Sequence, residues 1–175
     1  MSQTVNKSDL NENPKKHLKI TIDIEVYNQA SDLPAPYLQL LEEAKEATKS
    51  AYAPYSQFFV GSAILLEDKT IVRGSNQENA AYPSGICAER TAIYYTGAQY
   101  PNHSIEAIAV IARREIGSYL PAAPCGACRQ AMLEYEEKQQ KPIKLILQGM
   151  GEKVYVLDSV SDLLPLKFGK DSLEQ

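Results

Sequence analysis

The chain has 175 residues, 44% of them hydrophobic and 23% charged, which suits one globular domain with a sizeable core. Its formal net charge of -4 leaves no basic surplus for holding a phosphate backbone, which argues against a nucleic-acid substrate. No apolar run approaches the roughly 20 residues that a membrane-spanning helix requires.

The N-terminal part is predicted to be an extension of the main domain. Residues 1–16 are polar and lack the apolar segment of a signal peptide, so we expect a loose tail and a cytoplasmic protein. From His17 to Val26 apolar and polar residues alternate, which predicts a half-buried strand added to a sheet edge. Its apolar side carries Leu18, Ile20, Ile22, Ile24 and Val26. We therefore divide the chain into an extension (1–32), a main domain (33–170) and a short tail (171–175).

The main domain is predicted to interleave helices with strands. Helices are expected over residues 34–50, 86–97 and 159–164, and from Pro124 onward. Strands are expected over residues 57–66, 70–74, 105–112, 143–147 and 153–157, the first two as a hairpin. Residues 113–124 are expected to be a long loop. This order predicts a layered α/β domain with a mixed sheet.

All three cysteines fall in two short stretches that indicate a metal site. Cys125 and Cys128 are three residues apart, so on a helix their side chains project from one face and can share one metal ion. Cys87 lies near the start of another predicted helix, and helix N-termini favour the thiolate form that binds zinc. Three protein ligands with a fourth position open are typical of a catalytic zinc, not a structural one. We expect one Zn²⁺ per chain.

Two neighbours of Cys87 complete this hypothesis. Zinc would lower the pKa of a water in the open position from about 15.7 toward 7. Glu89, two residues after Cys87, is not needed as a ligand and can carry a proton between that water and a substrate. Arg90 can hydrogen-bond the sulfurs and offset the negative charge of three thiolates.

Simpler interpretations compete with the metal site. The Cys-x-x-Cys pair alone is often a redox pair, although no redox-site flanks accompany it. A closed structural zinc would need a fourth ligand such as His103. A Ser-His-Asp hydrolase would have to use His17 or His103, and nothing in the sequence supports it.

Four segments in order resemble the cytidine deaminases in their homotetrameric three-cysteine form. These segments are Tyr52 to Gly61, Gly74 to Tyr82, Cys87 to Thr91 and Pro124 to Gln130. The Cys-x-Glu and Pro-Cys-x-x-Cys arrangement is the pattern of zinc deaminases. The resemblance implies a three-layer α/β/α sandwich with a mixed central sheet. It implies hydrolytic deamination of cytidine and deoxycytidine to uridine and deoxyuridine with release of ammonia, a reaction of pyrimidine salvage.

The resemblance also implies roles for individual residues. Cys87, Cys125 and Cys128 would be the zinc ligands, Glu89 the proton carrier and Arg90 the charge-balancing neighbour. Phe58 would stack on the base, Asn76 and Glu78 would bind the ribose, and the Ala88 backbone would contact the pyrimidine edge. Tyr82 and Phe168 match aromatic positions that help to close active sites, partly across subunit boundaries of a homotetramer.

Three rival functions stay open at this point. A deaminase of another aminated nucleoside, such as a blasticidin-type antibiotic, is disfavoured by the Asn76-x-Glu78 pair. An editor of nucleic-acid bases would need a basic groove. A zinc-stabilised binding protein would show no turnover, so release of ammonia from cytidine would exclude it.

Overall fold

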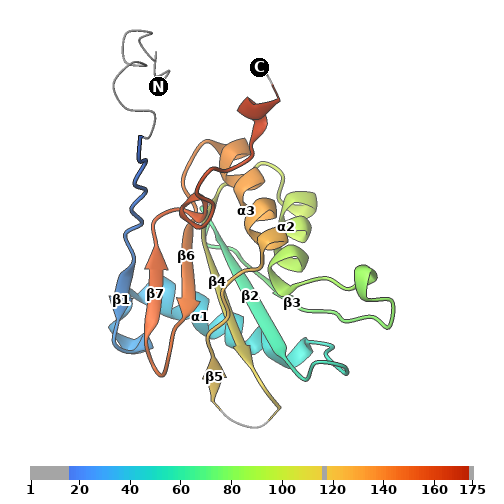
Figure 1. Cartoon of the computed structure of the whole chain (residues 1–175). Helices are drawn as coiled ribbons and strands as arrows, with labels where there is room; N and C mark the ends of the chain where they lie inside the picture. Colours follow the sequence, from blue (N-terminus) through green and yellow to red (C-terminus); the bar gives the residue numbers. More distant parts are fainter. Residues whose placement is uncertain (1–15, 116–117, 174–175) are drawn as a thin grey trace, which may run out of the picture.

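The computed structural model describes residues 16–115 and 118–173, and their central feature is a mixed sheet (Figure 1). The strand order among these residues is β1-β7-β6-β4-β2-β3, and β5 pairs with the end of β4. The parallel pair is β4 with β6, whereas the remaining pairs are antiparallel. The strands are β1 (Glu25–Tyr27), β2 (Phe59–Leu66), β3 (Ile71–Ser75), β4 (Ile105–Arg113), β5 (Tyr119–Leu120), β6 (Lys144–Gln148) and β7 (Val154–Leu157).

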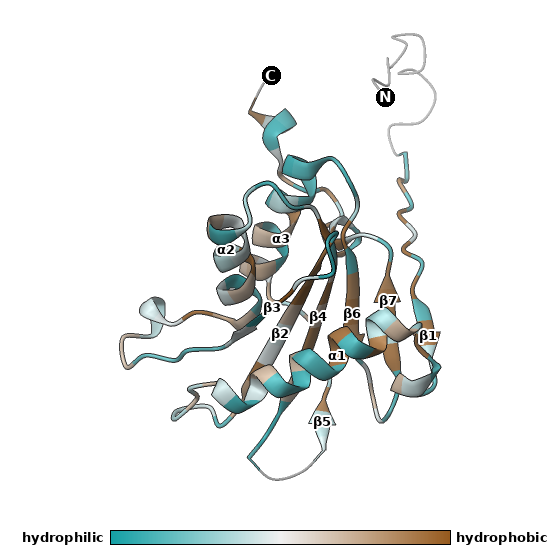
Figure 2. Ribbon diagram, turned by 180° about the vertical axis from the view of Figure 1, so that it is seen from behind, coloured by the Kyte–Doolittle hydropathy of each residue, from teal (hydrophilic) through white to brown (hydrophobic). Residues whose placement is uncertain are grey.

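Helices cover both faces of the sheet, so the predicted three-layer α/β/α sandwich is confirmed (Figures 1 and 2). The helix α1 (Ala35–Ala47) packs on one face, and α2 (Ala88–Gln99) with α3 (Gly126–Gln139) packs on the other. Short 3₁₀ turns are η2 (Ala30–Asp32), η3 (Thr48–Ser50), η4 (Tyr82–Ser84), η5 (Val160–Leu163) and η6 (Lys170–Ser172). Among the described residues no helix is long and apolar enough to cross a membrane.

The strand β4 divides the core into two halves. Ile108 and Val110 face the α2/α3 side, whereas Ala109 and Ile111 face α1. A strand covered on both faces needs apolar residues at every position, which is why residues 105–112 form a continuous apolar run. The centre of the sheet is therefore the rigid platform from which the neighbouring loops project.

Two glycines let the helices approach the sheet closely. A Cβ on Gly61 would lie 2.0 Å from the Ala44 carbonyl oxygen on α1, and one on Gly74 would lie 2.5 Å from the Ala92 nitrogen on α2. Both distances are far below contact distance, so only glycine permits this packing. Gly74 thereby fixes where the first turn of α2 stands.

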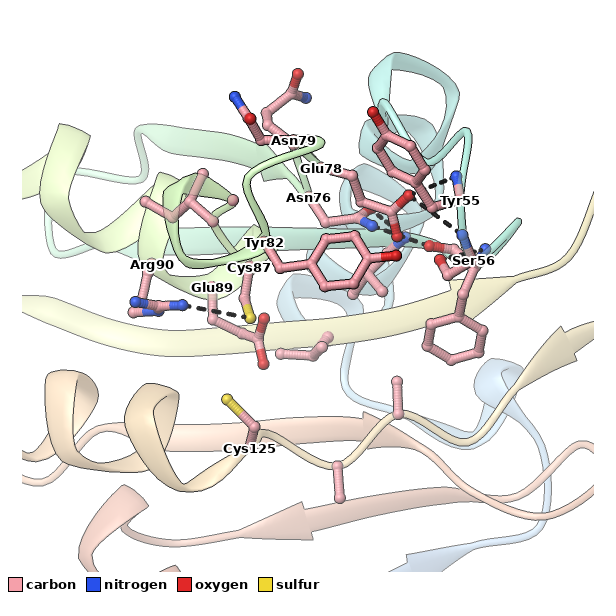
Figure 3. Close-up of a pocket in the computed structure, with 18 of the residues that line it drawn as sticks. Tyr55, Ser56, Asn76, Glu78, Asn79, Tyr82, Cys87, Glu89, Arg90 and Cys125 are labelled. Carbon is pink, nitrogen blue, oxygen red and sulfur yellow. Dashed lines mark hydrogen bonds between the residues drawn. The ribbon is translucent and has the colours of Figure 1, made fainter.

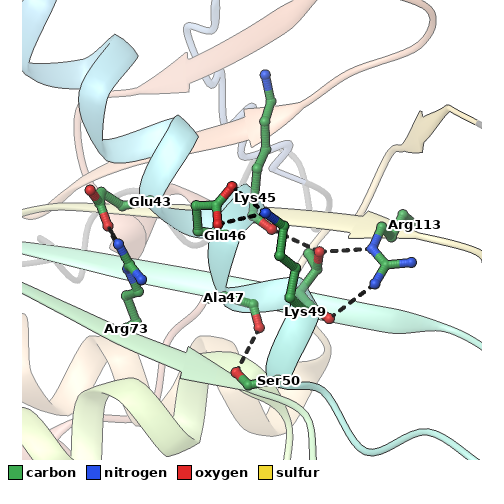
Figure 4. Close-up of polar contacts among 9 residues, drawn as sticks. Glu43, Lys45, Glu46, Ala47, Lys49, Ser50, Arg73 and Arg113 are labelled. Atoms are coloured by element: carbon green, nitrogen blue, oxygen red, sulfur yellow. Dashed lines mark hydrogen bonds and ion pairs between the residues drawn. The ribbon is translucent and has the colours of Figure 1, made fainter.

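Polar contacts fix α1 to the sheet on the other face (Figure 4). Arg73 of β3 pairs with Glu43, and Arg113 at the end of β4 donates to Thr48 Oγ1 at 2.9 Å. The Arg113 guanidinium also lies 4.9 Å from the centre of the Phe59 ring. These contacts join α1 to β3 and to the end of β4, and they join the end of β4 to the start of β2.

The structure corrects the predicted N-terminal strand. Pairing is limited to β1, which lies beside β7 at the end of the sheet, and the apolar side chains from Leu18 to Val26 are exposed, not half-buried. Alternation indicated a two-sided strand, but no described segment covers its apolar side. The loop expected over residues 113–124 contains the short strand β5, which is too brief for a sequence pattern to reveal.

Candidate active site

The three cysteine thiols converge between the starts of α2 and α3. Cys87 is the N-cap of α2 and Cys125 is the N-cap of α3, one position before the predicted first turns, while Cys128 lies in the first turn of α3. Their sulfurs all lie within 4.8 Å of one another, and the Cys125 and Cys128 sulfurs are 3.4 Å apart. That separation is too long for a disulfide bond, which measures about 2.05 Å.

The donor set fits zinc. Tetrahedral Zn–S bonds of about 2.3 Å place two sulfurs about 3.8 Å apart, which falls inside the observed spread of the three thiols. The site is held in place by Arg129, which donates to the Pro124 carbonyl at 2.8 Å and to the Leu163 carbonyl at 3.1 Å. Pro124 immediately precedes Cys125, so this contact positions the cap that carries the thiol.

The local electrostatics favour a thiolate. Hydrogen bonds from the Cys128 thiol and from Arg90 lower the pKa of Cys87 to about 5. The same contact with Cys87 raises the pKa of the Cys128 thiol, so within this thiol pair Cys87 is the first to ionise. The Arg90 Nη2 atom lies 3.7 Å from the Cys87 sulfur, the geometry expected of a charge-balancing neighbour.

Glu89 is a buried carboxyl beside this cluster. Its side chain is 5% exposed and points into the gap between Cys87 and Cys125 (Figure 3). Burial raises the pKa of Glu89, and the neighbouring Cys87 thiolate adds to that effect. A raised pKa favours the protonated form of a carboxyl, which can donate its proton to a bound molecule.

A cavity of about 900 Å³ opens directly onto Cys87, Glu89 and Cys125. Its walls come from segments 55–60, 76–90 and 121–125, with Val110 and Arg114. Two of the predicted substrate aromatics lie there: Phe58 is half-buried, and the exposed Tyr82 makes an edge contact with Tyr55 at 6.0 Å. The cavity is large enough for a nucleoside-sized molecule.

Asn76 and Glu78 also line the cavity, and both clamp the segment opposite (Figure 3). The Asn76 amide accepts from the Val60 nitrogen at 2.8 Å and donates to the Phe58 carbonyl at 2.9 Å. Glu78 Oε2 accepts from the backbone nitrogens of Tyr55 and Ser56 at 2.9 and 3.2 Å. Hydrogen bonds from Ser56 and Tyr55 lower the pKa of Glu78. Both of these backbone bonds use Oε2.

Three predicted site residues stand apart from the cavity wall. Cys128 and Ala88 are buried behind it. Phe168 is 59% exposed, and its carbonyl accepts from Gln130 on the outer side of α3, so within one chain its ring does not reach the cavity.

Sequence reasoning missed the wall formed by residues 121–123 and by Arg114. These residues lie in the segment predicted as a plain loop. The sequence signal that could have revealed this wall is the pair of prolines at positions 121 and 124, because proline keeps the residue before it extended. An extended chain here runs alongside the cavity and ends at Cys125.

Comparisons with known proteins agree with this geometry. Residues 36–141 match the family model described as the cytidine and deoxycytidylate deaminase zinc-binding region. A cytidine deaminase of Halalkalibacterium halodurans is 40% identical over 134 residues, covering 77% of this chain and 95% of that protein. One of Sporosarcina psychrophila is 41% identical over 135 residues, covering 77% and 93%.

Solved structures agree as well. The crystal structure of a cytidine deaminase from Burkholderia pseudomallei is 41% identical, with a TM-score of 0.63 over 74% of this chain and 97% of that one. The structure of a cytidine deaminase from Mycobacterium tuberculosis is 34% identical, with a TM-score of 0.56 over 76% and 97%.

Proposed function

This chain belongs to the cytidine and deoxycytidylate deaminase family, and on that premise we propose that it hydrolyses cytidine and deoxycytidine to uridine and deoxyuridine with release of ammonia. The observation that carries the proposal is the convergence of three thiols and one buried carboxyl at the wall of a nucleoside-sized cavity. We assign the reaction to residues 33–170. We place it in the cytoplasm, where thiols stay reduced, and in pyrimidine salvage.

Cys87, Cys125 and Cys128 would hold one Zn²⁺ per chain. When bound, the metal supplies an activated water to the reaction. Arg90 supports the ligand set by donating toward the Cys87 sulfur, which offsets part of the negative charge of three thiolates.

Glu89 moves the protons. Burial raises the pKa of Glu89 and so favours its protonated form, which can donate to the N3 atom of the pyrimidine ring and make C4 more electrophilic. Glu89, which is then a carboxylate, can take a proton from the attacking water and deliver it to the departing amine as the bond from C4 to that nitrogen breaks. Its position in the gap between Cys87 and Cys125 lets one side chain serve both steps (Figure 3).

The cavity wall would hold the nucleoside around that centre. Phe58 would stack on the base, and the backbone of Ala88 would contact the pyrimidine edge. Asn76 and Glu78 would bind the sugar, while the Oε2 atom of Glu78 keeps the 55–56 turn in place. Tyr82 would cover the ligand from the exposed side.

We also propose a homotetramer in which Phe168 closes the active site of a neighbouring subunit. This assignment is supported by the exposure of Phe168 and by its distance from the cavity in its own chain. Mixing inactive Glu89→Gln chains with inactive Phe168→Ala chains should restore part of the activity, because some hybrid sites combine an intact Glu89 with an intact Phe168. No recovery despite proven subunit exchange would contradict the assignment.

The proposal is tested with the purified, zinc-loaded protein. Cytidine, deoxycytidine, free cytosine and a blasticidin-type antibiotic are each assayed for ammonia and for the deaminated product. We expect equal amounts of uridine and ammonia from cytidine, and a much lower kcat/KM for cytosine, which lacks the sugar. Turnover of the antibiotic alone would assign the site to that substrate instead.

A further inference from the structure

An extended arm leaves the sheet at the N-terminal side of β1. Residues 16–24 continue β1 as a nearly straight segment that runs beyond the other strands (Figures 1 and 2). Every second side chain is apolar and exposed: Leu18 is 79% exposed, Ile20 49%, Ile22 38%, Ile24 47% and Val26 54%. Proteins rarely leave such a stripe on an open strand, because it is a ready site for pairing with another chain.

The arm has free backbone edges to offer. Within the described part of the chain, β1 is the last strand of the sheet, and residues 16–24 pair with no strand. Residues 1–35 also precede the region matched by the family model. The arm is therefore an addition to the matched domain, and no residue of it lines the active-site cavity.

The polar side of the arm is complementary to itself. When two arms run antiparallel with Thr21 opposite Thr21, each Lys19 lies opposite Asp23 and each His17 lies opposite Glu25. Lys19 and Asp23 carry opposite charges, which stabilises antiparallel strands on which they face each other, and the imidazole of His17 can donate a hydrogen bond to Glu25. A register centred on Ile22 also offers one ion pair per arm, Lys19 with Glu25, but it places His17 opposite Tyr27 instead of a carboxylate. A register centred on Asp23 opposes two carboxylates. On the apolar side, the Thr21 register places Leu18 opposite Ile24 and Ile20 opposite Ile22.

We infer that the arm binds a second copy of this chain, by antiparallel pairing of residues 17–25 about a twofold axis at Thr21. The two paired arms form a two-stranded ribbon, and the two domains lie at its opposite ends. Val26 of one chain is separated from Val26 of the other by about ten residues at 3.3 Å each, or roughly 33 Å. That spacing leaves room for both sheets, which become continuous through the ribbon. A twofold contact of this kind uses the same surface on both chains and closes without forming a fibre.

The ribbon still has one apolar face, formed by the two stripes together. Two ribbons stacked face to face, about 10 Å apart as in a β-sandwich, would cover it. This arrangement uses four chains, which is compatible with the homotetramer proposed above. The pairing of the arms does not depend on that assembly or on the reaction, so a failure of the proposed function would leave it untouched.

A disulfide trap tests the register in the full-length, zinc-loaded protein. In Thr21→Cys, the two introduced thiols face each other with Cβ atoms about 5 Å apart, close enough to form a disulfide with a small adjustment. The matched control is Asp23→Cys. In that variant the two introduced thiols lie four residues apart along the ribbon, or about 13 Å. Mild oxidation should link Thr21→Cys chains at least tenfold faster than Asp23→Cys chains or the wild type, as resolved on non-reducing gels. Equal rates in Thr21→Cys and Asp23→Cys would overturn the inference.

An exchange of charges provides the second part of the test. Two Thr21→Cys chains distinguished by a tag carry Lys19→Glu in one and Asp23→Lys in the other. When two copies of the same variant pair, the side chain at position 19 of one chain faces a side chain of like charge at position 23 of the other. A mixed pair instead places the introduced carboxylate opposite the introduced ammonium, and the native Asp23 of one chain opposite the native Lys19 of the other. The mixed disulfide should exceed either self-linked product about tenfold. A statistical distribution of products would show that the side chains of the two arms do not face each other, which excludes the proposed pairing.

Discussion

Replacing Gly74 with alanine should disturb the active site by displacing the backbone of the helix that carries part of it. The new Cβ would lie 2.5 Å from the Ala92 nitrogen and 2.6 Å from the Ala88 carbonyl oxygen, both in the backbone of α2. Favourable carbon contacts begin near 3.5 Å, so α2 must move away from β3 by about 1 Å. Overpacking of this kind costs about 1–3 kcal/mol, which lowers the Tm of a chain of this length by about 2–12 °C.

The displaced helix carries the chemistry. Cys87 caps α2 and Glu89 lies in its first turn, so the same movement shifts one proposed metal ligand and the proposed proton carrier. A misplacement of about 1 Å can cost a hundredfold in rate. We therefore expect kcat/KM for cytidine to fall about a hundredfold, together with faster loss of zinc to a chelator.

Gly61→Ala is the matched control. Its Cβ would meet the Ala44 carbonyl oxygen at 2.0 Å and the Thr48 nitrogen at 2.8 Å, on α1 and at the start of η3. Its loss of stability should equal or exceed that of Gly74→Ala, but below its Tm its kcat/KM should fall less than tenfold. If the two variants lost activity equally, or if Gly74→Ala melted at the wild-type temperature, the argument from close packing would be wrong.

Three further changes probe separate features. Cys125→Ala should reduce bound zinc from about one per chain to a small fraction, measured by metal analysis, because two thiols hold the ion much more weakly; full zinc content would exclude this ligand. Glu136→Ala removes a carboxylate that accepts from the Ile143 and Val160 nitrogens, so it should cost about 2–5 kcal/mol in denaturant unfolding with activity kept in the folded fraction, and an unchanged midpoint would refute that role. Glu78→Ala should lower kcat/KM for cytidine a hundredfold or more but spare residual activity on cytosine, whereas equal losses would assign Glu78 to the fold alone.

The three-cysteine cluster was predictable because much of its information is local. Cys125 and Cys128 lie three residues apart at a helix start, and Cys87 and Glu89 lie two apart at another, so spacing alone brought each pair to one end of a helix. The structure moved Cys87 and Cys125 by a single position, to the N-caps. The layered fold was predictable for the same reason, since apolar runs such as residues 105–112 mark the strands.

Hydrogen bonds between distant segments were not predictable. The sequence suggested that Glu78 binds a sugar, but its bonds to the nitrogens of Tyr55 and Ser56 join residues more than 20 positions apart and have no local pattern. Alternation in residues 17–26 indicated a strand with an apolar side, and it was wrong about burial. A period of two reports that a strand has two different sides, and it carries no information about which segment covers them.

The central claim is that Glu89 carries protons for deamination at the three-cysteine site, and Glu89→Gln tests it most directly. Uridine formation from cytidine is measured for the wild type and the variant at equal zinc content and comparable Tm. The change keeps the shape of the side chain but removes the transferable proton, so turnover should fall by about 10² to 10⁴ or more. Near-normal turnover in a zinc-loaded, folded variant would contradict the claim, because the buried carboxyl would then have no part in the reaction.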